Sequence, residues 1–125
     1  MKRYLLSTLL LSAVAIAMAA DSWKDEVPTA SRERVNPLAQ DKDAALVGNK
    51  LYREHCASCH GKDGAGTGKK PSLRSASVQS ASDGELFWLL SNGRIRKGMP
   101  DWRKLPEAQR WQIVSYLKAL PQPKQ

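Results

Sequence analysis

The chain has 125 residues, of which 20 are Lys or Arg and 12 are Asp or Glu, so its formal net charge is +8. This length allows one domain at most, and so small a core usually needs a covalent or metal-based staple. The positive charge alone would suit a nucleic-acid binder, but the basic residues lack the interleaved aromatic side chains of such a surface. The composition therefore favours a small basic domain that does not bind nucleic acid.

Residues 1–19 have the pattern of a secretory signal peptide. Lys2 and Arg3 form a basic start, an apolar stretch follows, and Ala17-Met18-Ala19 supplies a small-residue cleavage site. The alternative is an uncleaved membrane anchor, for which the apolar run is marginal in length. We expect cleavage after Ala19 and export to the periplasm.

Residues 20–40 are charged and rich in turn-forming residues, without apolar periodicity. We expect an extended N-terminal lead or a tail wrapped on the surface. The first regular helix is predicted to begin near Asp41, a plausible helix cap. The positions that then recur at helical spacing are Ala44, Val47, Gly48, Leu51, Tyr52 and His55. Gly48 inside a helix costs about 1 kcal/mol relative to alanine, which indicates the close approach of another helix.

This helix runs directly into the sequence Cys56-Ala57-Ser58-Cys59-His60. Each of the two thiols can add to one vinyl group of a haem, and the histidine that follows can then ligate the iron through Nε2. The five-residue pattern is the attachment signal of c-type haem. It predicts one covalently bound haem c, attached through Cys56 and Cys59, with His60 as the proximal iron ligand.

Other interpretations of the motif explain less of it. A disulfide between the two cysteines leaves His60 without a role, and a thioredoxin-like pair needs βαβ surroundings that the sequence lacks. A zinc site built from His55, Cys56, Cys59 and His60 would place all four ligands within six residues. Structural zinc sites usually draw their ligand pairs from separated segments.

After the motif, residues 61–71 contain four glycines without periodicity and are predicted to form a loop. Ser82-Asp83-Gly84-Glu85 matches a capping box for a second helix, which is expected to stop at Asn92-Gly93. A last helix is expected from Pro106 to just before Pro121. The chain is therefore predicted to be all-α, with three main helices and long loops. The domain spans residues 41–121, and residues 122–125 form a tail.

Iron ligated by one histidine has a second axial position, for which Met99 is the best candidate. The other two methionines leave with the signal peptide, so Met99 is the only methionine of the mature chain. It lies between Gly98 and Pro100, which suit a loop of fixed shape close to the iron. His55 cannot compete, because it directly precedes Cys56 and is tied to the proximal side.

These features together resemble the class I cytochromes c, in particular the small bacterial periplasmic kind with one haem. The matching motifs are Cys56-x-x-Cys59-His60, Gly48-x-x-x-Tyr52, Pro71-x-Leu73 and Met99-Pro100. The resemblance implies the cytochrome c fold, in which the first and last helices cross at a glycine–aromatic contact. The residues expected to meet Gly48 and Tyr52 on the last helix are Trp111, Tyr116 or Leu117.

The resemblance also assigns further haem-binding residues. The carbonyl of Pro71 is expected to accept a hydrogen bond from the His60 ring, which would fix the tautomer of the ring. Leu73 belongs to the same motif, although Lys70 stands where the family more often has glycine. The tryptophans Trp88 and Trp102 are interpreted as haem-pocket residues, and Trp102 as a candidate contact of a haem propionate.

Closure of the iron by two protein ligands leaves no position for a small-molecule substrate. The predicted function is therefore one-electron transfer by a diffusible periplasmic carrier, and the chain is not expected to be an enzyme. The alternatives are a haem-bearing electron-transfer subunit of a periplasmic dehydrogenase or oxidase, and a peroxidase-type haem enzyme.

Several basic residues lie on segments that flank the expected haem edge. They are Lys69, Lys70, Arg94, Arg96 and Lys97. A positive rim around a redox centre steers a protein toward acidic docking surfaces. We therefore expect redox partners with acidic surfaces among membrane or periplasmic oxidoreductases; the alternative is an ordinary solvated surface.

Overall fold

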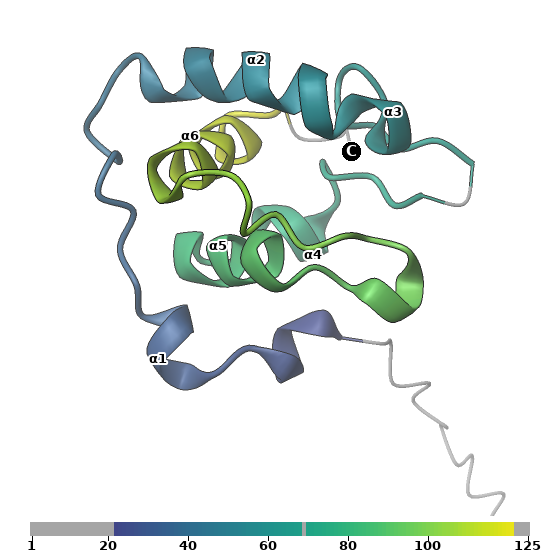
Figure 1. Cartoon of the computed structure of the whole chain (residues 1–125), viewed down its shortest axis with the longest axis horizontal. Coiled ribbons are helices and arrows are strands. Elements are labelled where there is room, and N and C mark those ends of the chain that lie inside the picture. Colours follow the sequence, from purple (N-terminus) through teal and green to yellow (C-terminus); the bar gives the residue numbers. More distant parts are fainter. Residues whose placement is uncertain (1–21, 69, 122–125) are drawn as a thin grey trace, which may run out of the picture.

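The computed structural model describes residues 22–68 and 70–121. The expected signal peptide, Lys69 and the expected tail of residues 122–125 lie outside these ranges. All the secondary-structure elements in these ranges are helices. None of these helices is long and apolar enough to cross a membrane. The predicted all-α class is confirmed (Figure 1).

Three long helices form the body of the domain, as predicted. They are α2, Ala44–His55, α5, Asp83–Asn92, and α6, Glu107–Lys118. Five short helical turns complete the described part: η1, Trp23–Glu26, α1, Thr29–Arg32, α3, Ala57–His60, α4, Ala76–Gln79, and η2, Ile95–Lys97. Figure 1 shows α2 lying across α6, with α5 on the other side of α6.

The helices α2 and α6 approach each other most closely at Gly48. A Cβ atom on Gly48 would collide with the backbone carbonyl of Gln112 and would stand 2.9 Å from Cβ of Tyr116. Tyr52, one turn further along α2, is fully buried, and its ring centroid lies 5.0 Å from that of Tyr116. The expected contact between the first and last helices is thus present, and Gln112 is the neighbour that the pattern does not name.

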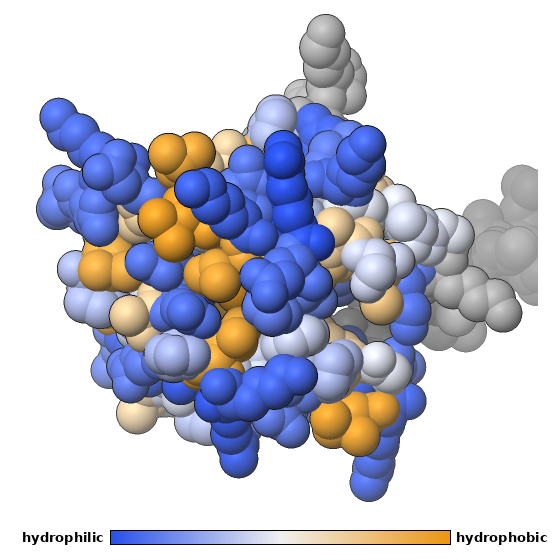
Figure 2. All heavy atoms as spheres, turned by 45° about the horizontal axis from the view of Figure 1, so that its top comes forward, coloured by the Kyte–Doolittle hydropathy of each residue, from blue (hydrophilic) through white to orange (hydrophobic). Residues whose placement is uncertain are grey.

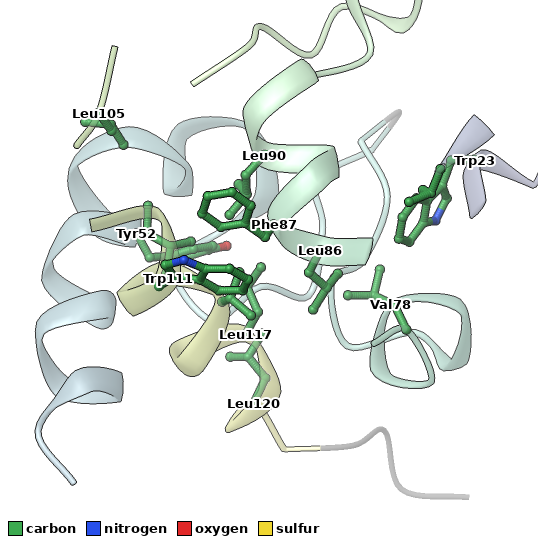
Figure 3. Close-up of a cluster of buried hydrophobic side chains, with 14 residues drawn as sticks. Trp23, Tyr52, Val78, Leu86, Phe87, Leu90, Leu105, Trp111, Leu117 and Leu120 are labelled. Carbon is green, nitrogen blue, oxygen red and sulfur yellow. The ribbon is translucent and has the colours of Figure 1, made fainter. Parts of the chain in front are cut away.

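The helix α5 begins at the predicted capping box. The Ser82 N–H donates to the Glu85 carboxylate at 2.8 Å, and the Glu85 N–H donates to the Ser82 hydroxyl at 3.1 Å. The helix then stacks Phe87 on Trp111 of α6, with ring centroids 3.9 Å apart. Figure 3 shows this pair within the cluster of buried apolar side chains that joins α5 to α6.

Residues 22–36 form an N-terminal strap that packs on the domain. Trp23 and Val27, four residues apart, are 8% and 3% exposed and belong to the buried core. The strap also lies directly on α5, because a Cβ atom on Gly84 would collide with the carbonyl of Ser31. The N-terminal lead is expected from its sequence to be either extended or wrapped on the surface. Its described part is wrapped on the surface of the domain.

The outer face of α2 leaves apolar side chains in contact with solvent. Leu46 and Val47 are 61% and 37% exposed, and Val35 at the end of the strap is 80% exposed. Figure 2, in which α2 is turned forward, shows apolar atoms among hydrophilic ones on this face. Leu46 and Val47 belong to the first turn of α2, whereas the Cys-x-x-Cys-His motif follows its last turn.

Candidate functional site

The Cys-x-x-Cys-His motif forms the turn that ends α2. Cys56 caps α2, and the N–H groups of Cys59 and His60 donate to the Cys56 carbonyl at 3.2 and 3.0 Å. Cys56 is half-buried against the core, Cys59 is exposed, and no disulfide joins them. Both sulfurs are therefore available for bond formation on a single helical turn.

The ring of His60 is oriented by the loop that follows it. Its Nδ1 lies 3.1 Å from the carbonyl oxygen of Pro71. A carbonyl can only accept, so Nδ1 carries the proton and Nε2 keeps its lone pair. This is the hydrogen bond that the family resemblance implies, and it leaves Nε2 as the nitrogen able to bind a metal.

Hydrogen bonds to backbone carbonyls fix the loop between His60 and Pro71. The N–H of Gly66 donates to the His60 carbonyl at 2.8 Å, and the Thr67 hydroxyl donates to the Cys59 carbonyl at 2.5 Å. Gly66 has a φ of +88°, and a Cβ atom there would stand 2.8 Å from the carbonyl oxygen of Lys70. A side chain at position 66 would therefore displace the segment that orients the imidazole.

Tyr52 connects the helix crossing to this turn. Its hydroxyl donates to the carbonyl of Gly61 at 2.6 Å. Burial raises the pKa of Tyr52 well above its usual value, so the hydroxyl keeps its proton and remains a donor at any physiological pH. The position of the motif is thus coupled to the packing of α2 on α6.

Met99 lies in a tight return of the chain between α5 and α6. Its N–H donates to the carbonyl of Arg94 at 3.1 Å, and its own carbonyl accepts from the Arg94 N–H at 2.9 Å. Gly98, with a φ of +85°, supplies the left-handed residue that this return requires. The Met99 side chain is half-buried against the core, and Figure 1 shows its segment on the side of the molecule where α3 lies.

The other expected haem contacts lie around the same region. Leu73, Trp88 and Trp102 are all half-buried against the core. The Trp102 ring lies 5.3 Å from the ring of His55, at the end of α2 beside the motif. Trp88 instead lines a surface hollow of about 580 Å³ together with residues 92–97 and part of the strap. Trp102 thus lies beside the attachment motif, whereas Trp88 lies beside the segment that leads to Met99.

The expected basic rim is partly engaged in contacts within the protein. The Arg94 guanidinium lies 3.4 Å from the carboxylate of Glu26, and the Arg94 side chain is only 20% exposed. The Lys70 amine reaches the Met99 segment, where it would stand 3.3 Å from a Cβ atom on Gly98. The exposed residues of this part of the rim are Ile95, Arg96 and Lys97. This part of the rim is therefore an exposed turn in which the apolar side chain of Ile95 stands next to the cations Arg96 and Lys97.

The residues present fit a covalently attached haem. In residues 22–68 and 70–121, no three His, Cys, Asp or Glu side chains converge as a metal-ion site. Burial, and to a smaller extent the neighbouring Cys59, raises the pKa of the Cys56 thiol to about 11, so the free thiol keeps its proton at neutral pH. The donors present are two unpaired sulfurs on one turn, an imidazole with Nε2 available and a thioether on a second segment, which suit a c-type haem.

Three supporting contacts of the site are not indicated by the sequence pattern. They are Gly66 with Lys70, Gly93 with Pro100, and Glu26 with Arg94. The two glycines themselves could be found by searching the sequence for glycines near the candidate ligands, because they lie in a predicted loop and at a predicted helix stop. Their contact partners could not be found in this way. No pattern pairs Glu26 with Arg94, because 68 positions separate them in the chain.

Comparisons with known proteins match the cytochromes c. The family model described as cytochrome C oxidase, cbb3-type, subunit III, matches residues 43–117. Cytochrome c550 of Pseudomonas aeruginosa is 28% identical over 102 residues, which cover 78% of this chain and 67% of that protein. The crystal structure of cytochrome CL from the marine methylotroph Methylophaga aminisulfidivorans is similar with a TM-score of 0.59, at 22% identity and over 89% of this chain and 73% of that one. At this identity the structural similarity shows the fold alone.

The family match covers more than half of the chain, which therefore belongs to the c-type cytochromes, in the family described as cytochrome C oxidase, cbb3-type, subunit III. The chain has the cytochrome c fold and carries covalently bound haem c, for which Cys56 and Cys59 have the attachment spacing. Its function is haem-based electron transfer, and it is not an enzyme.

Proposed function

We propose that the chain is a periplasmic one-electron carrier whose haem is attached through Cys56 and Cys59 and whose iron is ligated by His60 and Met99. The observation that carries this proposal is the 3.1 Å contact between His60 Nδ1 and the Pro71 carbonyl. It supports a ring proton on Nδ1 and, in this proposal, leaves Nε2 as the atom that binds the iron. When bound, the haem supplies reversible exchange of one electron between Fe(III) and Fe(II).

The two axial residues have different roles in this proposal. The Pro71 carbonyl holds the His60 ring in one orientation and makes the imidazole a stronger donor. The Met99 thioether is a soft ligand that favours Fe(II), and axial ligand choice spans roughly 0.8 V across haem proteins. With both positions taken, no small-molecule substrate reaches the iron.

Leu73, Trp88 and Trp102 are proposed to cover the haem faces and exclude water. All three are half-buried side chains on segments that also carry or adjoin the axial residues. The indole N–H of Trp102 is proposed to donate to a haem propionate. A dry pocket strengthens the iron–thioether bond against displacement by water.

The partners in this proposal are redox proteins with acidic docking surfaces. Arg96 and Lys97 are exposed beside Ile95, which is itself 65% exposed. Charges of one sign around such a surface accelerate encounter with an acidic partner. The expected signal peptide of residues 1–19 places the encounter in the periplasm, with the carrier anchored to the membrane if that peptide is retained.

A second candidate function is that of an electron-transfer subunit bound permanently to a dehydrogenase or oxidase. The observation that favours it is the exposed apolar surface of Leu46 and Val47, at the other end of α2 from the attachment motif. A subunit could bind through this surface and keep its haem edge open. Elution of the native protein from gel filtration at high and low salt, alone or with a dehydrogenase or oxidase, separates the two functions.

The replacement Met99→Ala tests the proposed ligation. The oxidised wild-type protein should show the weak red charge-transfer band of a methionine–Fe(III) bond, and the variant should lose it while retaining its haem. The ferrous variant should then bind carbon monoxide readily, and its reduction potential should fall. Leu51→Ala, which truncates a half-buried apolar side chain on α2, is the matched control and should change none of these properties. An unchanged spectrum in the Met99→Ala variant would assign the sixth ligand elsewhere.

A further inference from the structure

An ion pair between Glu26 and Arg94 joins the N-terminal strap to the Met99 segment. Glu26, in η1, places its carboxylate 3.4 Å from the guanidinium of Arg94. The side chains are 58% and 20% exposed, so the arginine is largely covered and the glutamate faces solvent. Both residues line the hollow of about 580 Å³ beside Trp88. The ion pair therefore lies at the edge of a surface hollow, which the Met99 segment also lines.

The strap end of this pair is held firmly on the domain. Trp23 and Val27, on either side of Glu26, are buried in the core. The Arg32 guanidinium donates to the carbonyl of Lys24 at 2.6 Å and to that of Val27 at 2.9 Å. The backbone around Glu26 is thus fixed by burial and by hydrogen bonds that do not involve the Met99 segment.

Arg94, the other member of the pair, is hydrogen-bonded to Met99. Arg94 exchanges two backbone hydrogen bonds with Met99, at 2.9 and 3.1 Å, so the two residues move together. The intervening turn is exposed at Ile95, Arg96, Lys97 and Gly98 and has little burial of its own. A restraint on the Arg94 side chain is therefore also a restraint on the position of Met99.

From these contacts we infer that Glu26 is a positioning residue for Met99: by holding Arg94 it keeps the thioether at the iron. This inference rests on the proposed ligation of the iron by Met99. It gives the N-terminal strap a role in the redox site, although the strap lies far from the attachment motif in sequence. Loss of the ion pair should leave the fold intact and make Met99 easier to displace.

Competition with imidazole measures how firmly Met99 is held. Any loss of restraint that favours the Met99-dissociated form raises the apparent affinity for an added ligand by the same factor. The test titrates imidazole into the oxidised full-length haem protein at pH 7 and follows the loss of the red charge-transfer band. The variants are Glu26→Gln, Arg94→Gln, their double variant and the charge exchange Glu26→Arg with Arg94→Glu.

The chain offers a matched control in the ion pair between Arg34 and Glu107. It also joins the strap to the rest of the domain, at 2.8 Å, and its side chains are 44% and 59% exposed. Neither residue belongs to the Met99 segment. Glu107→Gln therefore removes the same charge from a similar strap contact without changing the Glu26–Arg94 pair. Melting temperatures measured for every variant check that all are folded.

The expected result is imidazole binding about two- to fivefold tighter for Glu26→Gln than for wild type, the scale of an exposed ion pair. The double variant should bind no more tightly than Arg94→Gln alone, because Glu26 is inferred to act only through Arg94. The charge exchange should restore the wild-type affinity. Glu107→Gln should bind imidazole as wild type does.

Two results would overturn the inference while leaving the proposed ligation in place. One is a wild-type imidazole affinity in Glu26→Gln, and the other is an equal gain in Glu107→Gln, which would assign the effect to the strap as a whole. A wild-type protein without the charge-transfer band would instead remove the proposed ligation and this inference together. The band in the wild type therefore separates the two kinds of failure.

Discussion

Gly93 lies directly against the carbonyl group of Pro100, so that a Cβ atom at position 93 would stand 2.5 Å from both the carbon and the oxygen of that group. Gly93 also has a φ of +64°, which terminates α5. Because Pro100 follows Met99, the end of α5 determines where the Met99 segment returns to the domain. A residue marked in the sequence as a helix stop therefore also supports the candidate ligand.

Replacing Gly93 by alanine should weaken both the fold and the methionine ligation. The positive φ and the collision with Pro100 together should lower the free energy of unfolding by about 2–4 kcal/mol. The red charge-transfer band should weaken at neutral pH, as measured alongside urea unfolding. Gly68→Ala is the control, because Gly68 has a φ of +47° and no neighbouring atom within 4 Å. Equal losses in the two variants would show that backbone conformation alone, and not the contact with Pro100, is responsible.

Gly48→Ala should destabilise the crossing of α2 on α6. The added methyl group meets the Gln112 carbonyl and Cβ of Tyr116, so the helices must separate. We expect the overpacking to outweigh the better helix propensity of alanine and to lower the free energy of unfolding by about 1–3 kcal/mol. Lys50→Ala, at an exposed position of the same helix, should leave it nearly unchanged. Greater stability of Gly48→Ala in urea unfolding would contradict the close approach.

The fold follows from local patterns more readily than the site does. The helical spacing up to His55, the capping box at Ser82 and the last helix after Pro106 all produce the expected helices, because each signal lies within its own helix. The strap has no apolar periodicity, and two buried side chains, Trp23 and Val27, attach it to the core. Its packing depends on residues far away in the chain, which local periodicity cannot indicate.

The candidate site shows the same division. The spacing of Cys56, Cys59 and His60 is a local feature and could be read directly, and the family resemblance supplied the contact of His60 with Pro71. The pairing of Glu26 with Arg94 has no local or family signal, because it joins a strap to a loop. An expected rim charge, Arg94, is accordingly engaged inside the protein rather than presented to a partner.

The ion pair between Arg34 and Glu107 should make stability depend on pH in acid. Hydrogen bonds from Arg34 and from the indole of Trp111 hold the pKa of Glu107 below its usual value of 4.5. A carboxyl whose pKa is lowered in the folded state contributes stability above 4.5 and loses it as the pH falls through the folded-state pKa. The melting temperatures of wild type and Glu107→Gln should therefore differ at pH 7 and converge below pH 4.5. A difference that stays constant down to pH 3 would contradict this linkage.

Reversing Arg96 and Lys97 to glutamate should slow bimolecular electron transfer to an acidic redox protein. The loss should be largest at low ionic strength, because the screening length is about 8 Å at physiological salt. Stopped-flow rates measured against salt concentration test this, with the reduction potential recorded for each variant. The control reverses Lys42 and Lys50, which are also exposed but precede the last turn of α2. Equal slowing in both double variants would show that net charge, and not a docking surface, sets the rate.

The haem should remain attached to the wild-type chain after extraction with acidified acetone, because thioether bonds survive conditions that remove iron ligands. The double replacement of Cys56 and Cys59 by alanine should abolish this retention and lower the yield of folded protein. Met99→Ala should retain its haem in the same extraction, since the axial bond does not hold the macrocycle covalently. Absorbance in the organic phase from the wild type would count against attachment through these cysteines.

The crossing of α2 on α6 joins two helices that about fifty intervening residues separate, from the end of α2 at His55 to the start of α6 at Glu107. The entropy of closing so long a loop grows only logarithmically, so that even doubling it costs about 0.6 kcal/mol. Insertions and deletions between the two helices are thus nearly neutral for the crossing itself. What limits the length of this region is the helix α5, the contact of Gly93 with Pro100, and the registry of His60 with Pro71 and of Met99 with Arg94. Evolution can therefore reshape the surface loops around the redox site, provided that the added residues fall outside these elements.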